Sequence, residues 1–167
     1  LDYIRRLGAL VGAGDKASAY ADELRRGLDA IEARAASLPR RPRVYFEEWD
    51  EPPITGIRWV SELVAIAGGN DIFPERAAEP LAKGRILEDS SEVIRRVPDI
   101  VIGSWCGKKF RPDKVAARPG WEAIPAVRDG ELHEVKSPLI LQPGPAALTD
   151  GVRELHRIIA GWATKRG

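Results

Sequence analysis

The sequence predicts an α/β fold in which a mainly parallel sheet is flanked by helices and is preceded by a long helix. Three observations indicate this fold. Apolar residues recur at steps of three and four over residues 15–38, the spacing of one helical face. Two short apolar runs, at residues 44–47 and 100–104, are typical of buried strands, and helix-patterned segments separate and follow them. Strands that alternate with helices are typical of a parallel sheet covered by helices.

The N-terminal residues predict a helical segment, residues 1–39, ahead of an α/β lobe at residues 40–167. Residues 1–7 are helix-patterned from the first position, so we expect the chain to be a fragment that lacks its N-terminal part. Asp15 is the predicted N-cap of the next helix, residues 15–38, which Pro39 follows. At 1.5 Å per residue this helix spans about 36 Å, which favours a connector between two lobes.

The first half of the predicted lobe begins with the strand at residues 44–47. A loop at residues 52–56 leads to a helix over residues 59–67, which the glycines at 68 and 69 end. Residues 71–83 are polar and have no regular pattern. Residues 89–92 have the pattern of a capping box, which predicts a helix over residues 91–96 that halts before Pro98.

The second half begins with the strand at residues 100–104, an unbroken apolar run that predicts burial on both faces. A short helix is expected at residues 112–118. Residues 123–127 and 132–135 predict two short strands joined by a tight turn, with the second at the edge of the sheet. A proline-rich loop at residues 138–145 precedes a closing amphipathic helix over residues 146–163.

The composition limits the kinds of function to consider. The 167 residues suffice for one domain with a substantial core, and a formal net charge of +1 gives no reason to expect a nucleic-acid partner. The longest apolar runs fall well short of the roughly 20 residues that span a bilayer. A single cysteine and two histidines exclude an internal disulfide and do not favour a metal site made by the protein alone. The scarcity of cysteine fits either the cytoplasm or an exported protein.

Trp49 and Trp105 each stand at the end of a predicted strand, where the chain turns away. In open α/β sheets, ligands bind outside the carboxyl ends of the strands. Two large aromatic side chains at that edge predict a flat apolar ligand held between walls. The alternative is packing in the core or at its rim, because aromatic side chains supply large buried area anywhere.

An acidic run surrounds Trp49, and it consists of Glu47, Glu48, Asp50 and Glu51. A catalytic carboxylate pair is one interpretation. Adjacent strand residues point to opposite faces, so Glu47 and Glu48 do not share a site in a regular strand. A solvated strand end is the other interpretation, with one acid left to accept hydrogen bonds from a ligand.

Cys106 precedes Lys108 and Lys109, which favours a thiolate of lowered pKa. A catalytic cysteine needs a base, and nothing in the sequence brings His133 or His156 near it. The sequence therefore predicts a binding protein and not an enzyme, with Cys106 left as a ligand contact or as a ligand to the metal of a bound cofactor. The lysines, together with Arg111, form a basic patch that is either a solvated loop or a contact for an anionic group.

Three stretches together resemble a known family: residues 42–49, residues 59–73 and residues 90–102. They are similar to the C-terminal lobe of ABC-transporter substrate-binding proteins of the helical-backbone class, which capture cobalamin, haem and ferric siderophores. The resemblance covers nearly the whole chain and is closest to the cobalamin-binding branch. Its most specific marks are residues 68–73, with the Gly-Gly-Asn run followed by Ile-Phe, and residues 90–102, with Ser-x-Glu followed by Pro-Asp.

The resemblance implies a Rossmann-like C-terminal lobe, with residues 15–38 joining it to an N-terminal lobe that is absent from this chain. It implies an exported protein, in the periplasm or at the cell surface, that is monomeric when full length. On this resemblance, the protein is expected to carry a corrinoid such as cobalamin between two lobes to a membrane permease and to need no catalytic cofactor. Haem or a ferric siderophore is the alternative ligand. The rivals from other classes are a small α/β enzyme that uses Cys106 or an acid near Trp49, and a domain that binds a protein partner through the tryptophan edge.

The resemblance also implies particular site residues. Glu92 matches the surface glutamate through which the family docks on arginines of its permease. We expect both tryptophans to be exposed where the missing lobe would cover them. The loop at residues 137–144 and the stretch at residues 80–85 are the other expected walls, although residues 77–85 lack the aromatic contacts of the family. The predicted ligand contacts are Trp49, Glu48, Pro53, Arg85, Trp105, Cys106, Leu139 and Gln142.

Overall fold

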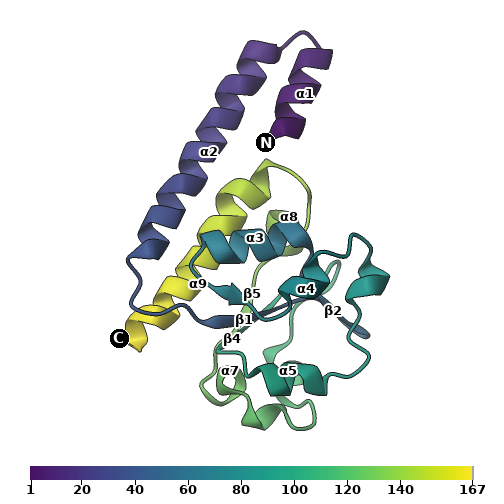
Figure 1. The fold of residues 1–167 in the computed structure, drawn as a ribbon. Coiled ribbons are helices and arrows are strands. Elements are labelled where there is room, and N and C mark those ends of the chain that lie inside the picture. Colours follow the sequence, from purple (N-terminus) through teal and green to yellow (C-terminus); the bar gives the residue numbers. More distant parts are fainter. Residues whose placement is uncertain (167) are drawn as a thin grey trace.

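Two antiparallel helices, α1 (Asp2–Leu10) and α2 (Gly14–Ala36), rise from one corner of the protein in a computed structural model that describes residues 1–166 (Figure 1). Gly12 has a φ of +72°, which lets the chain turn tightly between them. The lower part of α2 packs against the C-terminal helix, whereas the upper part pairs with α1 (Figure 1). The long predicted helix is confirmed. The predicted N-cap is wrong, because the helix starts at Gly14 and the capping residue is Ala13.

The sheet is mainly parallel, as predicted. Its central strand is β1 (Arg43–Asp50), with β4 (Ile100–Gly103) beside it and β5 (Leu132–Glu134) beyond β4 at the edge, all parallel. The other side of β1 carries two short strands. β3 (Asn70–Asp71) pairs parallel with the start of β1, and β2 (Pro53–Thr55) pairs antiparallel with its end. The carboxyl ends of β1, β4 and β5 therefore meet at one edge.

Helices cover both faces of this sheet, and alternate strand residues enter two separate cores. Val44 and Phe46 face the core formed with α2, α3 (Arg58–Ile66) and α9 (Val152–Lys165). Tyr45 and Val101 face the other core, which includes residues of α5 (Ser91–Arg96), α6 (Pro112–Ala116) and α7 (Pro125–Arg128). Every residue of β4 is buried, which confirms the prediction of a strand covered on both faces.

Four predicted segments differ from the structure. Residues 123–127 are not a strand: the 3₁₀ turn η2 (Trp121–Ala123) runs into α7, because Pro125 lacks the N–H that a strand needs and suits the first turn of a helix. The predicted loop at residues 52–56 contains β2. The predicted loop at residues 138–145 begins with α8 (Ser137–Ile140), and residues 71–83 include α4 (Pro74–Ala77) and enter the 3₁₀ turn η1 (Ala82–Arg85).

The closing helix is present, but it opens with a π-helical turn, η3 (Ala147–Gly151), before α9. A side chain at Gly151 would collide with the carbonyl of Leu139, so α8 packs directly on this turn. Among residues 1–166, no helix is both long enough and apolar enough to cross a membrane.

Candidate ligand-binding site

Trp49 and Trp105 come together at the carboxyl edge of the sheet. Glu47 of β1 pairs in register with Gly103 of β4. Trp49 follows Glu47 by two residues and Trp105 follows Gly103 by two residues, so the tryptophans reach the edge of the sheet at the same level. The ammonium group of Lys108 lies 4.2 Å from the ring centre of Trp49 and 5.2 Å from that of Trp105. Because ammonium groups are attracted to aromatic faces, this lysine links the two rings. The sequence predicted that the tryptophans share one edge, but it did not predict that Lys108 lies close to both rings.

Trp105 is only 3% exposed, so the expectation that it lies open to solvent is wrong. Its ring packs edge-on against Phe110 at 5.0 Å between ring centres. Phe110 in turn lies directly over Gly103, where any side chain would overlap its ring. The loop after β4 therefore folds back on the strand and covers Trp105. Trp49 is half-buried, and its Nε1 donates a hydrogen bond to the carbonyl of Glu51 at 2.9 Å.

Glu47 is fully buried beneath this edge and is not part of a solvated strand end. Arg118 donates two hydrogen bonds to its carboxylate, at 2.7 and 2.9 Å. Tyr45 donates a third at 2.9 Å, and the indole of Trp105 a fourth at 3.1 Å. Burial, together with the charge of Glu47, raises the pKa of Tyr45 well above its ordinary value. Burial favours the neutral form of Arg118, but the bonds to Glu47 prevail and raise its pKa.

Glu48 points to the opposite side of β1, as strand alternation predicts. Its carboxylate lies 2.8 Å from Arg85 and accepts a hydrogen bond from the backbone N–H of Ile57 at 2.6 Å. Burial raises the pKa of Glu48 in spite of these bonds. Arg85 is 3% exposed and also donates to the carbonyl of Thr55. The two residues, both proposed from the sequence as ligand contacts, therefore bind each other.

Asp50 ends β1 with a buried carboxylate that pairs with two lysines. Lys108 contacts one of its oxygens, and Lys114 lies 3.1 Å from the other. Lys114 also pairs with Glu51 at 2.7 Å. Burial alone would raise the pKa of Asp50, but the hydrogen bonds from Lys108 and Lys114 lower it. The acidic run that surrounds Trp49 is thus neutralised by cations, and these carboxylates do not form a free catalytic pair.

The remaining predicted contacts come from separate elements, and Leu139 packs against the core on the opposite face of the sheet from Trp49 and Trp105. Pro53 and Leu139 are half-buried, in β2 and α8, and Gln142 is exposed after α8. Cys106 is exposed after Trp105.

Cys106 has no histidine beside it. His133 contacts Glu131 at 2.8 Å, and His156 contacts the carbonyl of Ala67 at 3.0 Å. In residues 1–166 there is no group of three or more histidine, cysteine or acidic side chains placed to hold a metal ion.

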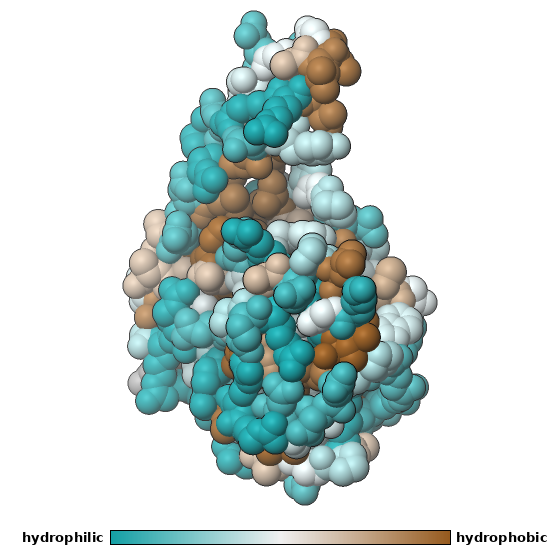
Figure 2. Space-filling model, turned by 45° about the vertical axis from the view of Figure 1, so that its right-hand side comes forward, coloured by the Kyte–Doolittle hydropathy of each residue, from teal (hydrophilic) through white to brown (hydrophobic). Residues whose placement is uncertain are grey.

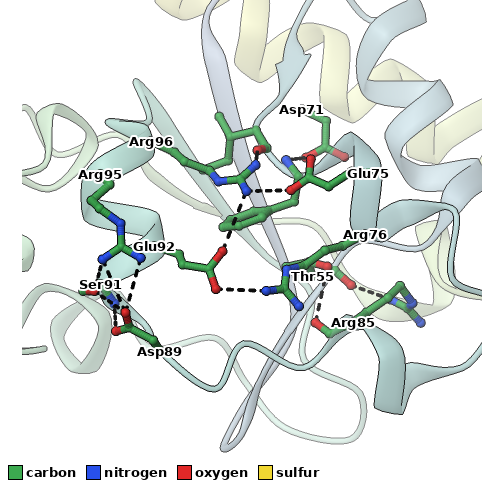
Figure 3. A network of polar contacts seen from close by, with 12 residues as sticks. Thr55, Asp71, Glu75, Arg76, Arg85, Asp89, Ser91, Glu92, Arg95 and Arg96 are labelled. Carbon is green, nitrogen blue, oxygen red and sulfur yellow. Dashed lines mark hydrogen bonds and ion pairs between the residues drawn. The ribbon is translucent and has the colours of Figure 1, made fainter.

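Glu92, at the start of α5, belongs to a separate charged network (Figure 3). Its carboxylate lies 2.9 Å from Arg76 and 3.7 Å from Arg96, and Arg96 also pairs with Glu75 at 2.6 Å. Arg96 lies over the ring of Phe73 and donates to a backbone carbonyl, so the network is fixed in place. The Glu92 side chain is 23% exposed. Sequence reasoning identified Glu92 but not its two arginine partners.

Several pockets open on the surface, and two of them adjoin the elements described above. An apolar one of about 520 Å³ is bounded by α1, Trp59 and the loop at residues 143–148. Above it, Leu10 and Val11 leave more than three quarters of their area exposed at the tip of the helical pair, where Figure 2 shows apolar side chains gathered. The other pocket, of about 380 Å³, lies beside Trp105 and is lined by lysines.

Residues 1–139 match the family model described as periplasmic binding protein. A periplasmic binding protein from Veillonella parvula is 26% identical, with a TM-score of 0.75 over 94% of this chain and 54% of its own. A search of curated proteins found no match.

Two further solved structures share the fold at lower identity. The haem complex of IsdE from Staphylococcus aureus has a TM-score of 0.79 at 18% identity, over 95% of this chain and 62% of that one. The vitamin B12 binding protein BtuF of Vibrio cholerae has a TM-score of 0.69 at 21% identity, over 96% of this chain and 60% of its own. The chain therefore spans only about 54–62% of the length of these structures.

Proposed function

Because the chain belongs to the periplasmic binding protein family, we propose that its protein captures a flat metal chelate and delivers it to a membrane permease. One observation carries the proposal: Trp49 and Trp105 follow adjacent parallel strands at the carboxyl edge of the sheet, and Lys108 links their rings. This edge is where α/β sheets bind ligands. Binding and release require no chemical step, and the carboxylates of Glu47, Glu48 and Asp50 around the tryptophans are each paired with cations.

A corrinoid such as cobalamin is the proposed ligand, since the sequence resemblance is closest to the cobalamin-binding branch. The vitamin B12 binding protein of Vibrio cholerae shares the fold, which is compatible with this choice. Haem-binding and iron-binding relatives share it as well, so haem and a ferric siderophore are the competing outcomes of the test.

Burial divides the proposed contacts into two groups. Trp49, Pro53, Leu139, Cys106 and Gln142 keep accessible surface and are proposed to touch the ligand. The other three are proposed to support the edge without touching the ligand: Trp105, Glu48 and Arg85. Trp105 and Arg85 are only 3% exposed, and Glu48 is paired with Arg85.

A second, N-terminal lobe is proposed to face this edge. The solved relatives are longer than this chain, which covers 54–62% of them. The exposed apolar tip at Leu10 and Val11 and the pocket of about 520 Å³ beside α1 are surfaces that such a lobe would bury. In this arrangement residues 1–39 carry the connecting helix and residues 40–167 form the C-terminal lobe of an exported protein, at the periplasm or cell surface.

Glu92 is the proposed docking residue for the permease. It lies in the first turn of α5, where its carboxylate keeps 23% of its surface exposed. Its partners, Arg76 and Arg96, hold it in one place and leave an edge of the carboxylate to meet an incoming arginine.

The test is a titration of the whole protein that carries this chain with cobalamin, cobinamide and haem, followed by tryptophan fluorescence and visible absorbance. We expect saturable binding of a corrinoid and about a tenfold weaker Kd for Trp49→Ala, the size that one lost aromatic contact allows. Trp49→Phe keeps an aromatic face and should retain most of the affinity. Tyr20→Ala, which removes an exposed aromatic from α2, is the matched control. Binding of none of the three ligands would refute the corrinoid and haem assignments.

A further inference from the structure

The pocket of about 380 Å³ beside Trp105 lies between the loop that follows β4 and the start of α8. Its lining includes Trp105, which forms part of the proposed ligand edge. It also includes three lysines, Lys108, Lys109 and Lys136, and one acid, Glu134. A pocket with three cations and one anion at this edge is electrostatically unlike the rest of the chain, whose formal net charge is +1.

Two of the three lysines in the pocket form ion pairs, and among residues 1–166 the third, Lys109, does not. Lys136 lies 2.7 Å from Glu134, and Lys108 pairs with Asp50 outside the pocket. Glu134 also accepts a hydrogen bond from the backbone N–H of Phe110 at 3.1 Å. Burial tends to raise the pKa of Glu134, but the hydrogen bonds from Lys136 and Phe110 and the nearby charges of Lys136 and Lys109 lower it, so the carboxylate stays ionised at neutral pH. Lys109 has no ion pair among residues 1–166.

We propose that this lysine-lined pocket binds an acidic oxygen group, a carboxylate or a phosphodiester, that projects from the edge of the captured chelate. The inference rests on the proposed function and narrows its ligand class to chelates with an anionic substituent. One monoanion balances the free charge of Lys109 and accepts hydrogen bonds from Lys109 and Lys136. An uncharged amide at the same place would accept weaker hydrogen bonds and leave the charge of Lys109 unbalanced.

Lys108 joins this pocket to the aromatic edge. It lines the pocket, and its ammonium lies over both tryptophan rings. A flat chelate resting against Trp49 is therefore next to the pocket, and a short flexible substituent suffices to reach Lys109. The lysine heads are partly solvated, with Lys136 62% exposed, so the attraction should weaken as salt concentration rises.

Two pairs of probes separate the acidic group from the macrocycle that carries it. Haem has two carboxylates and haem dimethyl ester has none, whereas cobalamin has a phosphodiester that cobinamide lacks. In the whole protein we expect the acidic member of whichever pair binds to have a Kd about tenfold lower, the effect of roughly one charge-assisted hydrogen bond in a partly exposed site. This preference should diminish at 1 M salt, where the Debye length is about 3 Å.

Variants of Lys109 test the residue itself. Lys109→Ala should weaken binding of the acidic probe about tenfold and leave its neutral partner nearly unchanged. Lys109→Arg should retain the preference, and Lys109→Glu should abolish it. Lys16→Ala removes an equal charge from the exposed first turn of α2, at the far end of the helical pair, and should change neither affinity.

The outcomes separate this inference from the proposed function. If a macrocycle binds but its acidic and neutral forms bind equally, or if Lys109→Ala weakens both forms alike, the pocket has no such role and the capture function stands. If neither macrocycle binds, the proposed function fails and the inference fails with it. Selective loss of the acidic form in Lys109→Ala, with Lys16→Ala unchanged, supports both.

Discussion

Removing the positive charge of Arg118 should destabilise the lobe strongly. Arg118→Met keeps an apolar stem but leaves the carboxylate of Glu47, which is fully buried, without its counter-ion. Loss of one partner from a buried ion pair costs about 3–5 kcal/mol. Tyr45 and Trp105 still donate hydrogen bonds to Glu47, and the Arg118 side chain is 15% exposed, so water partly replaces it. We therefore expect a loss of about 3 kcal/mol, at the lower end of this range.

Urea unfolding of the whole protein, followed by tryptophan fluorescence, measures this loss. With a slope of about 1–3 kcal/mol per molar urea, the midpoint should fall by about 1–3 M. Arg111→Met is the matched control, because Arg111 pairs with Asp113 at the surface, where both side chains are more than half exposed. An exposed pair contributes about 0–1 kcal/mol.

A second variant tests the cause of the loss. Adding Glu47→Gln to Arg118→Met removes the uncompensated charge and keeps an amide oxygen for Tyr45 and Trp105. This double variant should be more stable than Arg118→Met alone. The reasoning is refuted if Arg118→Met costs no more than Arg111→Met, or if the double variant is the less stable of the two.

Three further predictions concern docking, alkaline stability and packing. Glu92→Ala should impair ligand uptake in cells but leave ligand affinity unchanged in titrations, at a cost in stability of about 1 kcal/mol from its partly exposed ion pairs. Tyr45 has a folded pKa above its ordinary value of about 10, so its contribution to stability is complete below that pH and is lost as the pH rises further. Its tyrosinate absorbance near 295 nm, taken as the difference from Tyr45→Phe, should therefore appear only as the lobe unfolds. Gly103→Ala should cost about 1–3 kcal/mol in urea unfolding, because the new methyl group overlaps Phe110.

Each of these three has a result that would contradict it. Equal loss of uptake and affinity in Glu92→Ala would remove its docking role. A tyrosinate signal from Tyr45 before unfolding would mean that burial and the hydrogen bond to Glu47 do not hold its hydroxyl in the neutral form. A Gly103→Ala variant as stable as the parent would show that the ring of Phe110 can move away from a methyl group at this position without cost.

The sequence predicted the frame of the fold well. The periodicity of α2 and the apolar runs of β1 and β4 are local signals, and the structure contains all three elements. The alternation of strands and helices predicted a parallel sheet, and parallel neighbours bring their carboxyl ends to one edge. That is why the sequence alone predicted that Trp49 and Trp105 would be close. The strand expected over residues 123–127 was wrong because Pro125 started a helix there instead.

Only the tertiary structure decided which of these side chains remain accessible. Trp105 looked like a wall from its place after β4, yet Phe110 folds back over Gly103 and buries it. Glu47 pairs with Arg118, which comes from a different part of the chain. Ion pairs of this kind depend on how segments distant in sequence pack, so a local sequence pattern does not predict them.

The acidic and basic residues near the edge illustrate the same division. The sequence showed an acidic run at residues 47–51 and a basic run at residues 108–111, and each looked solvated. Folding places Lys108 against Asp50 and both tryptophans, and it leaves Lys109, in the pocket beside them, without an ion pair among residues 1–166. The sequence by itself thus determined that Trp49 and Trp105 would lie at one edge of the sheet, because the alternation of strands and helices predicts parallel strands whose carboxyl ends meet there. The charge that this edge presents was decided by packing, because it is set by which ion pairs form between distant segments.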